Sequence, residues 1–277
     1  MIQHDIVCDL AGLTLLVYEY GKSFIIDNNK TIETFISEIN NINHPIVNNE
    51  LYFDIMKDFA SSSPKGKVYK FYNIYSSDLQ VGITISEINK RICIIFRGTE
   101  SKLDWLYDLS VLKTHLHDNI YVHSGFYKQL HHEFTYNHLK IDLLWLINEY
   151  PNYDIYISGH SLGGALATLF GYEISFDIDK KINIISFASP RVGNYEFKKS
   201  FENKINLNHY RISNDQDIGT AVPIINYYHV GKNISLNNNS YSLNLTYNIF
   251  KFSLFYCWKI KEHYMELYFK RLKKITW

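Results

Sequence analysis

The sequence predicts an α/β fold in which a mostly parallel central sheet is covered by helices on both faces. Between residues 91 and 213, apolar runs of strand length alternate with stretches of helical periodicity, which is the pattern of a parallel sheet with crossover helices. Within that region, Gly159-His-Ser161-Leu-Gly163 joins a β-rich run to a helix of small residues. Such a sequence is typical of a sharp strand-to-helix turn in a sheet of this kind.

The length and composition of the chain favour one large domain. It has 277 residues, of which 46% are hydrophobic and 16% aromatic, and this content is enough for a sizeable core. The sequence contains no internal repeat and no linker that divides it. We therefore expect a single domain over residues 1–277.

The charge balance excludes one class of partner. Lys and Arg together number 28, as do Asp and Glu, so the formal net charge is zero. A nucleic-acid partner held by bulk positive charge is therefore not expected. The same balance gives no strong attraction to an anionic membrane, so any contact with lipid should be local and apolar.

The cysteines and the beginning of the sequence add further expectations. Three scattered cysteines form neither a disulfide framework nor a metal-ligand spacing, so no metal is expected. The first ten residues carry acids where a signal peptide would carry Lys or Arg, which favours a cytoplasmic over a secreted protein. No apolar run is long enough to form a transmembrane segment.

The expected elements follow from periodicity and from turn residues. A helix is expected over residues 5–20, and a short helix at Thr31–Ile39 lies in the weakly patterned stretch 21–64. A long helix follows Phe126 and ends near Glu149, before Pro151. Strands are expected at Val68–Tyr75, Leu79–Ser86, Arg91–Arg97, 153–158, Ile182–Pro190, Asn208–Ser213 and Tyr227–Leu236, followed by a polar loop at Asn237–Asn248 and an amphipathic helix at Trp258–Lys273.

Ser161 is the candidate nucleophile, because a serine at the centre of such a turn exposes its hydroxyl beside the next backbone N–H. A serine hydroxyl needs an imidazole to take its proton and an acid to orient that imidazole. Asp215 and Asp217 follow the strand that ends at Ser213, and either is a candidate acid. Chain order alone leaves two candidate bases open, His263 ahead of His229.

Four ordered motifs resemble the class 3 lipase family, the fungal-lipase-like α/β-hydrolases. They are Phe96-Arg-Gly-Thr99 with Asp104-Trp105-Leu106 and Asp108-Leu109, Val122-His-Ser-Gly-Phe126, Gly159-His-Ser161-Leu-Gly163, and Phe187-Ala-Ser-Pro-Arg-Val-Gly193. The resemblance implies an α/β-hydrolase fold and ester hydrolysis of acyl lipids without a cofactor. Triacylglycerol is the first expected substrate; the alternatives are a phospholipase A1, a monoacylglycerol or soluble-ester esterase, and a catalytically silent lipid-binding protein on the same scaffold.

The resemblance also assigns the partners of Ser161. The segment Arg211–Ile218 with Val222-Pro223 is similar to the family's acid motif, which favours Asp217 over Asp215, although Gly219-Thr-Ala is inserted before Val222. The stretch around His263 is similar to the family's C-terminal histidine motif, which favours it over His229. The backbone N–H of Leu162 is expected in an oxyanion hole because it follows the nucleophile, and the resemblance implies Thr99 as the second donor.

Residues 101–112 resemble a lid. Leu103, Trp105, Leu106 and Leu109 lie on one apolar face of this segment, while Asp104 and Asp108 lie on the other. We expect that face to cover the active cleft in water and to make transient contact with a lipid interface. The alternative is a core-packed helix after a strand.

Overall fold

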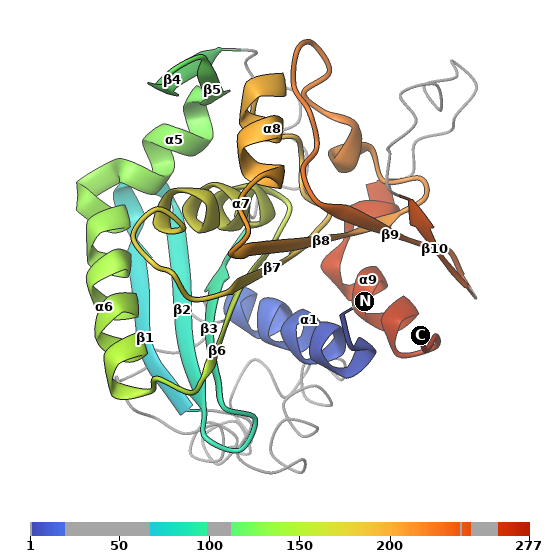
Figure 1. Cartoon of the computed structure of the whole chain (residues 1–277). Helices are drawn as coiled ribbons and strands as arrows, with labels where there is room; N and C mark the ends of the chain where they lie inside the picture. Colours follow the sequence, from blue (N-terminus) through green and yellow to red (C-terminus); the bar gives the residue numbers. More distant parts are fainter. Residues whose placement is uncertain (1, 20–66, 99–111, 239, 245–259) are drawn as a thin grey trace.

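The computed structural model describes residues 2–19, 67–98, 112–238, 240–244 and 260–277. Within these residues the chain forms an eight-stranded sheet in the order β1-β2-β3-β6-β7-β8-β9-β10 (Figure 1). The pairs from β3 to β9 are parallel, whereas β1–β2, β2–β3 and β9–β10 are antiparallel. The prediction of a mostly parallel central sheet is therefore confirmed.

The strands of this sheet have the following bounds: β1 Lys67–Ile74, β2 Leu79–Ser86, β3 Arg91–Phe96, β6 Asp154–His160, β7 Ile182–Phe187, β8 Leu207–Asn214, β9 Lys232–Leu236 and β10 Tyr241–Asn244. A separate hairpin pairs β4 (Lys113–His117) with β5 (Ile120–His123). Parallel register places Phe96 beside Gly159 and His160 beside Phe187, so three strands end together at the turn that carries Ser161.

Helices cover both faces of the sheet, because alternate strand residues belong to two apolar layers. Cys93 and Ile95 of β3 pack in the layer of α1 (His4–Glu19) and α9 (Met265–Leu272). Ile92 and Ile94 of the same strand pack in the opposite layer. That layer holds α5 (Ser124–His131), α6 (Thr135–Glu149), α7 (Leu162–Ile174) and α8 (Tyr195–Glu202).

Several of the expected elements differ from the structure. The long helix before Glu149 is interrupted, because Glu133 and Phe134 adopt positive φ angles of 47° and 59° between α5 and α6. The polar loop expected at Asn237–Asn248 contains strand β10, whose Tyr241 ring packs 5.1 Å from that of Trp277. The strand expected over Tyr227–Leu236 begins only at Lys232. The short helix expected at Thr31–Ile39 lies outside the described residues.

The two ends of the described chain meet beside α1 and α9 (Figure 1). The Trp277 indole Nε1 donates to the carbonyl of Ile2 at 3.0 Å, and His4 Nε2 donates to the carbonyl of Leu272 at 3.0 Å. Both contacts satisfy backbone carbonyls in a region of low exposure. These contacts fix α9, and with it the segment just before it, against the first helix.

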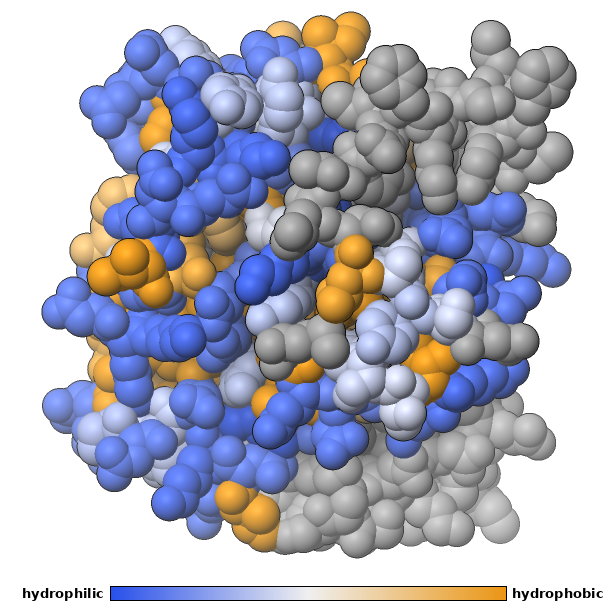
Figure 2. Space-filling model, turned by 45° about the vertical axis from the view of Figure 1, so that its right-hand side comes forward, coloured by the Kyte–Doolittle hydropathy of each residue, from blue (hydrophilic) through white to orange (hydrophobic). Residues whose placement is uncertain are grey.

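The surface drawn in Figure 2 is mainly hydrophilic, and its hydrophobic residues lie in small separate groups. No helix in the described part of the chain combines the length and apolarity needed to cross a bilayer. Scattered apolar side chains are normal on a protein surface. Figure 2 therefore shows no broad apolar patch on this face among the residues that are placed.

A close backbone approach fixes the turn between β6 and α7. A side chain at Gly163 would collide with the carbonyl of Phe96 and the backbone of Arg97, and one at Gly159 would collide with the carbonyl of Gly163. Only glycine permits the backbone of α7 to lie so close to the ends of β3 and β6, because it has no Cβ. The first turn of α7 is thereby held directly against the end of β3.

Gly163→Ala should destabilise the protein by about 2 kcal/mol or more, because overpacking against a rigid backbone outweighs the roughly 1 kcal/mol that alanine gains in a helix. Gly171→Ala is the matched control on the same helix, where the new methyl group meets the side chains of Ile184 and Ile157 and no backbone atom is among its nearest neighbours. Urea unfolding of both variants measures the difference. A Gly163→Ala protein more stable than wild type would show that helix propensity dominates and that the approach is loose.

Candidate active site

Ser161 occupies a strained backbone position at the end of β6. Its φ and ψ angles are 57° and −124°, a region that residues with a side chain rarely adopt. The turn is held because the N–H of Ser161 donates to Phe187 O at 2.9 Å and its carbonyl accepts from Gly164 N at 2.9 Å. This is the geometry of a nucleophile elbow, in which the serine hydroxyl stands above the carboxyl ends of the strands.

The structure brings Ser161, His263 and Asp217 into one hydrogen-bonded row. His263 Nε2 lies 2.8 Å from Ser161 Oγ, and His263 Nδ1 lies 2.7 Å from Asp217 Oδ1. A carboxylate only accepts, so Nδ1 carries the proton and Nε2 of the neutral ring accepts from the serine hydroxyl. All three residues are buried, with 2%, 6% and 1% of their surfaces exposed.

The Asp217 carboxylate is fixed by two further donors. Gly219 N–H donates to Oδ1 at 2.8 Å, and the Tyr268 hydroxyl donates to Oδ2 at 2.6 Å. A side chain at Gly219 would overlap the imidazole of His263, so glycine is needed for the ring to reach the acid. Gly219 belongs to the insertion Gly219-Thr-Ala, which forms part of a 3₁₀ turn, Ile218–Ala221, capped by Asp217 itself.

Asp215 has a different environment. Its side chain accepts from Ser235 Oγ at 2.5 Å, and its backbone N–H donates to Leu236 O at 3.1 Å. These contacts join the residue to β9 and leave it exposed, in contrast to Asp217. Of the two candidate acids, only Asp217 contacts a histidine in the part of the chain that the structure describes.

The segment that carries His263 is held at its backbone. His263 ends a 3₁₀ turn, Ile260–His263, and not the long helix expected at Trp258–Lys273. Its carbonyl accepts from His160 Nε2 at 2.7 Å, and the carbonyl of Glu262 accepts from Asn214 Nδ2 at 2.7 Å. The Glu262 carboxylate forms an ion pair with Arg271 of α9.

His160 is a neutral structural partner of this segment. Burial, and then the neighbouring His263, hold the pKa of His160 well below its usual range. Because a carbonyl cannot donate, Nε2 of the neutral ring carries the proton to His263 O, and Nδ1 accepts from the Tyr18 hydroxyl at 2.7 Å. A residue of α1 thus supports His263 indirectly, through the residue that precedes Ser161.

His229, the other candidate base, is engaged elsewhere. Its Nε2 donates to the carbonyl of Thr220 at 2.6 Å. Burial is the main cause that holds the pKa of His229 well below its usual range, and Arg211 and Arg191 lower it further. His229 therefore supports the far end of the 3₁₀ turn that begins at Asp217, and the structure brings His263 instead to the serine.

The remaining predicted site residues divide into described and undescribed ones. Leu162 is the first residue of α7, where a backbone N–H has no acceptor within its own helix. Thr99 and the lid residues Leu103, Trp105, Leu106 and Leu109 lie outside the described residues. No group of three or more His, Cys, Asp or Glu side chains in the described ranges could hold a metal ion.

Sequence reasoning missed several supporting residues, namely Tyr18, Asn214, Gly219 and Tyr268. No local signal identifies Tyr18 or Tyr268, because both approach the site from helices at opposite ends of the chain. In the sequence, Gly219 is recognisable only as a departure from the acid motif. A glycine two residues after the acid is a signal that a ring approaches the backbone there, because only glycine leaves room for it.

A serine elbow in a mostly parallel sheet, with an acid and a histidine supplied by later segments, defines the α/β-hydrolase fold. Residues 93–227 match the family model described as Lipase (class 3). This match covers the elbow and the acid loop, and over these residues the chain is similar to the class 3 lipase family. The family resemblance seen in the four motifs is thereby confirmed.

Curated relatives agree with this assignment. The chain is 32% identical to a lipase of Caenorhabditis elegans over 151 residues, which are 51% of this chain and 40% of the relative. It is 35% identical to a chloroplastic phospholipase A(1) of Arabidopsis thaliana over 159 residues, 50% of this chain and 35% of the relative. The chain thus spans less than half the length of either relative.

A solved structure confirms the fold. The triacylglyceride lipase of Rhizomucor miehei superposes with a TM-score of 0.73 at 18% identity, covering 97% of this chain and 96% of that one. At this identity the likeness concerns the fold. The α/β-hydrolase class expected from the sequence is the class observed.

Tyr268→Phe should lower the free energy of unfolding by about 1–3 kcal/mol, because it removes one buried hydroxyl that serves two partners. The hydroxyl donates to Asp217 and also accepts from the N–H of Asn214 at 2.8 Å. Tyr75→Phe is the control, since Tyr75 is 83% exposed. Urea unfolding of the two variants measures the effect, and equal stabilities would mean that the hydroxyl of Tyr268 does not hold the acid loop.

Proposed function

We propose that this protein is a serine carboxylic ester hydrolase of acyl lipids, with triacylglycerol as its substrate. The observation that supports the proposal most directly is the buried row of Ser161, His263 and Asp217, with contacts of 2.8 and 2.7 Å. A hydrogen-bonded serine, histidine and acid in this order is the arrangement that activates a hydroxyl for acyl transfer.

The proposed reaction proceeds in two steps. Ser161 Oγ attacks the ester carbonyl while His263 Nε2 takes the hydroxyl proton, and the Asp217 carboxylate stabilises the charged ring. His263 then returns the proton to the departing alcohol, which leaves an acyl group on Ser161. In the second step, a water molecule gives its proton to His263 and attacks this acyl-enzyme, which releases the fatty acid and restores the serine.

The backbone N–H of Leu162 is proposed as one donor of the oxyanion hole. It lies at the start of α7, where the helix dipole also favours negative charge. Thr99 is proposed as the second donor, on the resemblance alone. In enzymes of this type, the loss of one such donor lowers the rate by roughly 10²–10³-fold.

The proposed substrate class rests on the comparisons and on the lid motif. One curated relative is named a lipase and another a phospholipase A(1), and the matching structure is a triacylglyceride lipase. The apolar face of Leu103, Trp105, Leu106 and Leu109 is the proposed contact with a lipid interface. Phospholipids and soluble esters are the substrates against which triacylglycerol should be compared.

Ser161→Ala and Asp217→Asn should both abolish most of the ester hydrolysis. We expect a loss of roughly 10⁴–10⁶-fold for the serine variant and about 10⁴-fold for the acid variant, because the neutral amide no longer holds the required tautomer. Asp215→Asn is the matched control and should retain activity within about threefold, since its partner is Ser235. The assay is the initial rate on p-nitrophenyl butyrate and on a triolein emulsion.

Two results would overturn parts of this proposal. If the wild-type protein hydrolyses no acyl ester faster than Ser161→Ala does, the protein is a catalytically silent scaffold and not an enzyme. If the protein hydrolyses phosphatidylcholine but not triolein, the proposed mechanism stands, and the substrate is a phospholipid instead of triacylglycerol. Circular dichroism of each variant separates a catalytic loss from unfolding.

A further inference from the structure

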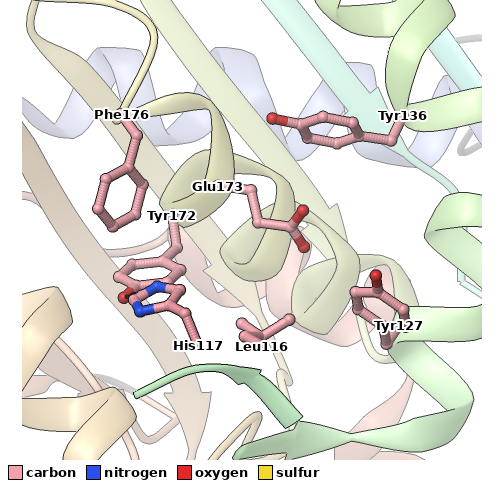
Figure 3. Close-up of a pocket in the computed structure, with 7 residues that line it drawn as sticks. All are labelled: Leu116, His117, Tyr127, Tyr136, Tyr172, Glu173 and Phe176. Carbon is pink, nitrogen blue, oxygen red and sulfur yellow. Dashed lines mark hydrogen bonds between the residues drawn. The ribbon is translucent and has the colours of Figure 1, made fainter. Parts of the chain in front are cut away.

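A hollow lies away from Ser161, at the far end of α7 (Figure 3). Its volume is about 460 Å³, which is within the range of small-molecule sites. Glu173 lies in it, twelve residues beyond Ser161, or about 18 Å along the helix axis at 1.5 Å per residue. A ligand in this hollow would therefore bind apart from the proposed reaction.

Aromatic rings form most of its wall. These rings belong to His117, Tyr127, Tyr136, Tyr172 and Phe176. They come from separate segments, namely β4, α5, α6 and α7 with the turn that follows it. A pocket with so many ring faces and few aliphatic side chains is adapted to a ligand that interacts with π-systems.

The rings are held in place before any ligand binds. Tyr172 is fully buried, so it supports the other rings from behind; its hydroxyl lies 2.8 Å from Ser200 Oγ, and its ring packs at 90° to that of Phe176 with centroids 5.2 Å apart. The imidazole of His117 lies parallel to the Tyr172 ring, 6.3 Å away at an interplanar angle of 11°. Such fixed side chains lose little conformational entropy on binding.

The lining of the pocket contains a carboxylate. Glu173 is the one acidic side chain that lines it among the described residues, and no Lys or Arg lines it there. Figure 3 shows the Glu173 carboxylate turned toward the space between Tyr127 and Tyr136. Both oxygens of this carboxylate contact His131 Nε2, at 3.0 and 3.2 Å, and these contacts orient it toward the pocket.

Two neighbouring features agree with a preference for cations. Burial raises the pKa of Tyr136, and the charges of Glu173 and Asp177 raise it further, so the phenol stays neutral. The ammonium group of Lys204 lies 3.1 Å from the centroid of the Phe176 ring, a cation–π contact within the chain that occupies one face of this ring. Nearby Asp177 is paired with Lys140 at 2.7 Å.

We infer that this pocket binds a quaternary ammonium group. A trimethylammonium ion is apolar on its surface, spreads its charge over its methyl groups and is attracted to ring faces. A trimethylammonium ion cannot donate a strong hydrogen bond, and the aromatic wall with its carboxylate does not require one. The group could reach the pocket as free choline or as the headgroup of a choline lipid.

Binding of choline should be compared with that of 3,3-dimethylbutan-1-ol, which has the same shape and no charge. Ligand-observed NMR titration of the full chain should show choline binding roughly tenfold more tightly, because cation–π attraction and the carboxylate act only on the charged ligand. A short-chain diacyl phosphocholine, tested on Ser161→Ala so that it is not hydrolysed, distinguishes the lipid headgroup from the free cation.

Two variants locate the site. Glu173→Gln keeps an acceptor for His131 and should reduce choline affinity about tenfold, and Phe176→Leu keeps the apolar volume and should reduce it about threefold. Glu196→Gln on α8 and Tyr75→Leu are matched controls outside the pocket, and both should bind as wild type does. Equal affinity for choline and its neutral analogue, or choline binding unaffected by Glu173→Gln, would overturn the inference.

Discussion

The close approach of three backbone segments at the elbow is the constraint on which the rest of the structure depends. Gly163 has no room for a side chain because the end of β3 lies directly against the first turn of α7. That contact forces Ser161 into its positive φ angle and presents its hydroxyl above the sheet. The energetic cost of this strained residue must be offset by the sheet, because β6, which ends at the turn, is paired with a buried parallel strand on each side.

The histidine and the acid come from segments that are distant in sequence, so their positions must be secured by side chains. Tyr268 of α9 donates to the acid, and Tyr18 of α1 bonds to His160, which in turn donates to the carbonyl of His263. Both helices lie on the same face of the sheet and contact each other. The first and last helices of the chain therefore act together as the support of the proposed base and acid.

Local patterns predicted much of this from the sequence, because strand alternation and the elbow glycines are local consequences of sterics. These patterns fail where tertiary contacts determine whether a helix breaks or a strand forms. No glycine or proline marks the break at Glu133 and Phe134, and β10 exists because β9 and Trp277 provide partners for a polar segment. The choice of Asp217 and His263 required a family resemblance, because chain order alone leaves two acids and two histidines open. Their hydrogen bonds in the structure agree with that choice.

The proposed nucleophile and the aromatic pocket lie at opposite ends of α7, so the two can be tested separately. For the central claim, that Ser161 is activated by His263 and Asp217, the most direct measurement is labelling with an alkyl fluorophosphonate, in which the serine oxygen displaces fluoride from phosphorus. Mass spectrometry of the labelled chain should find one adduct on the peptide that contains Ser161, formed at least about 100-fold more slowly in His263→Ala. Labelling of another residue, or an equal rate in that variant, would contradict the account.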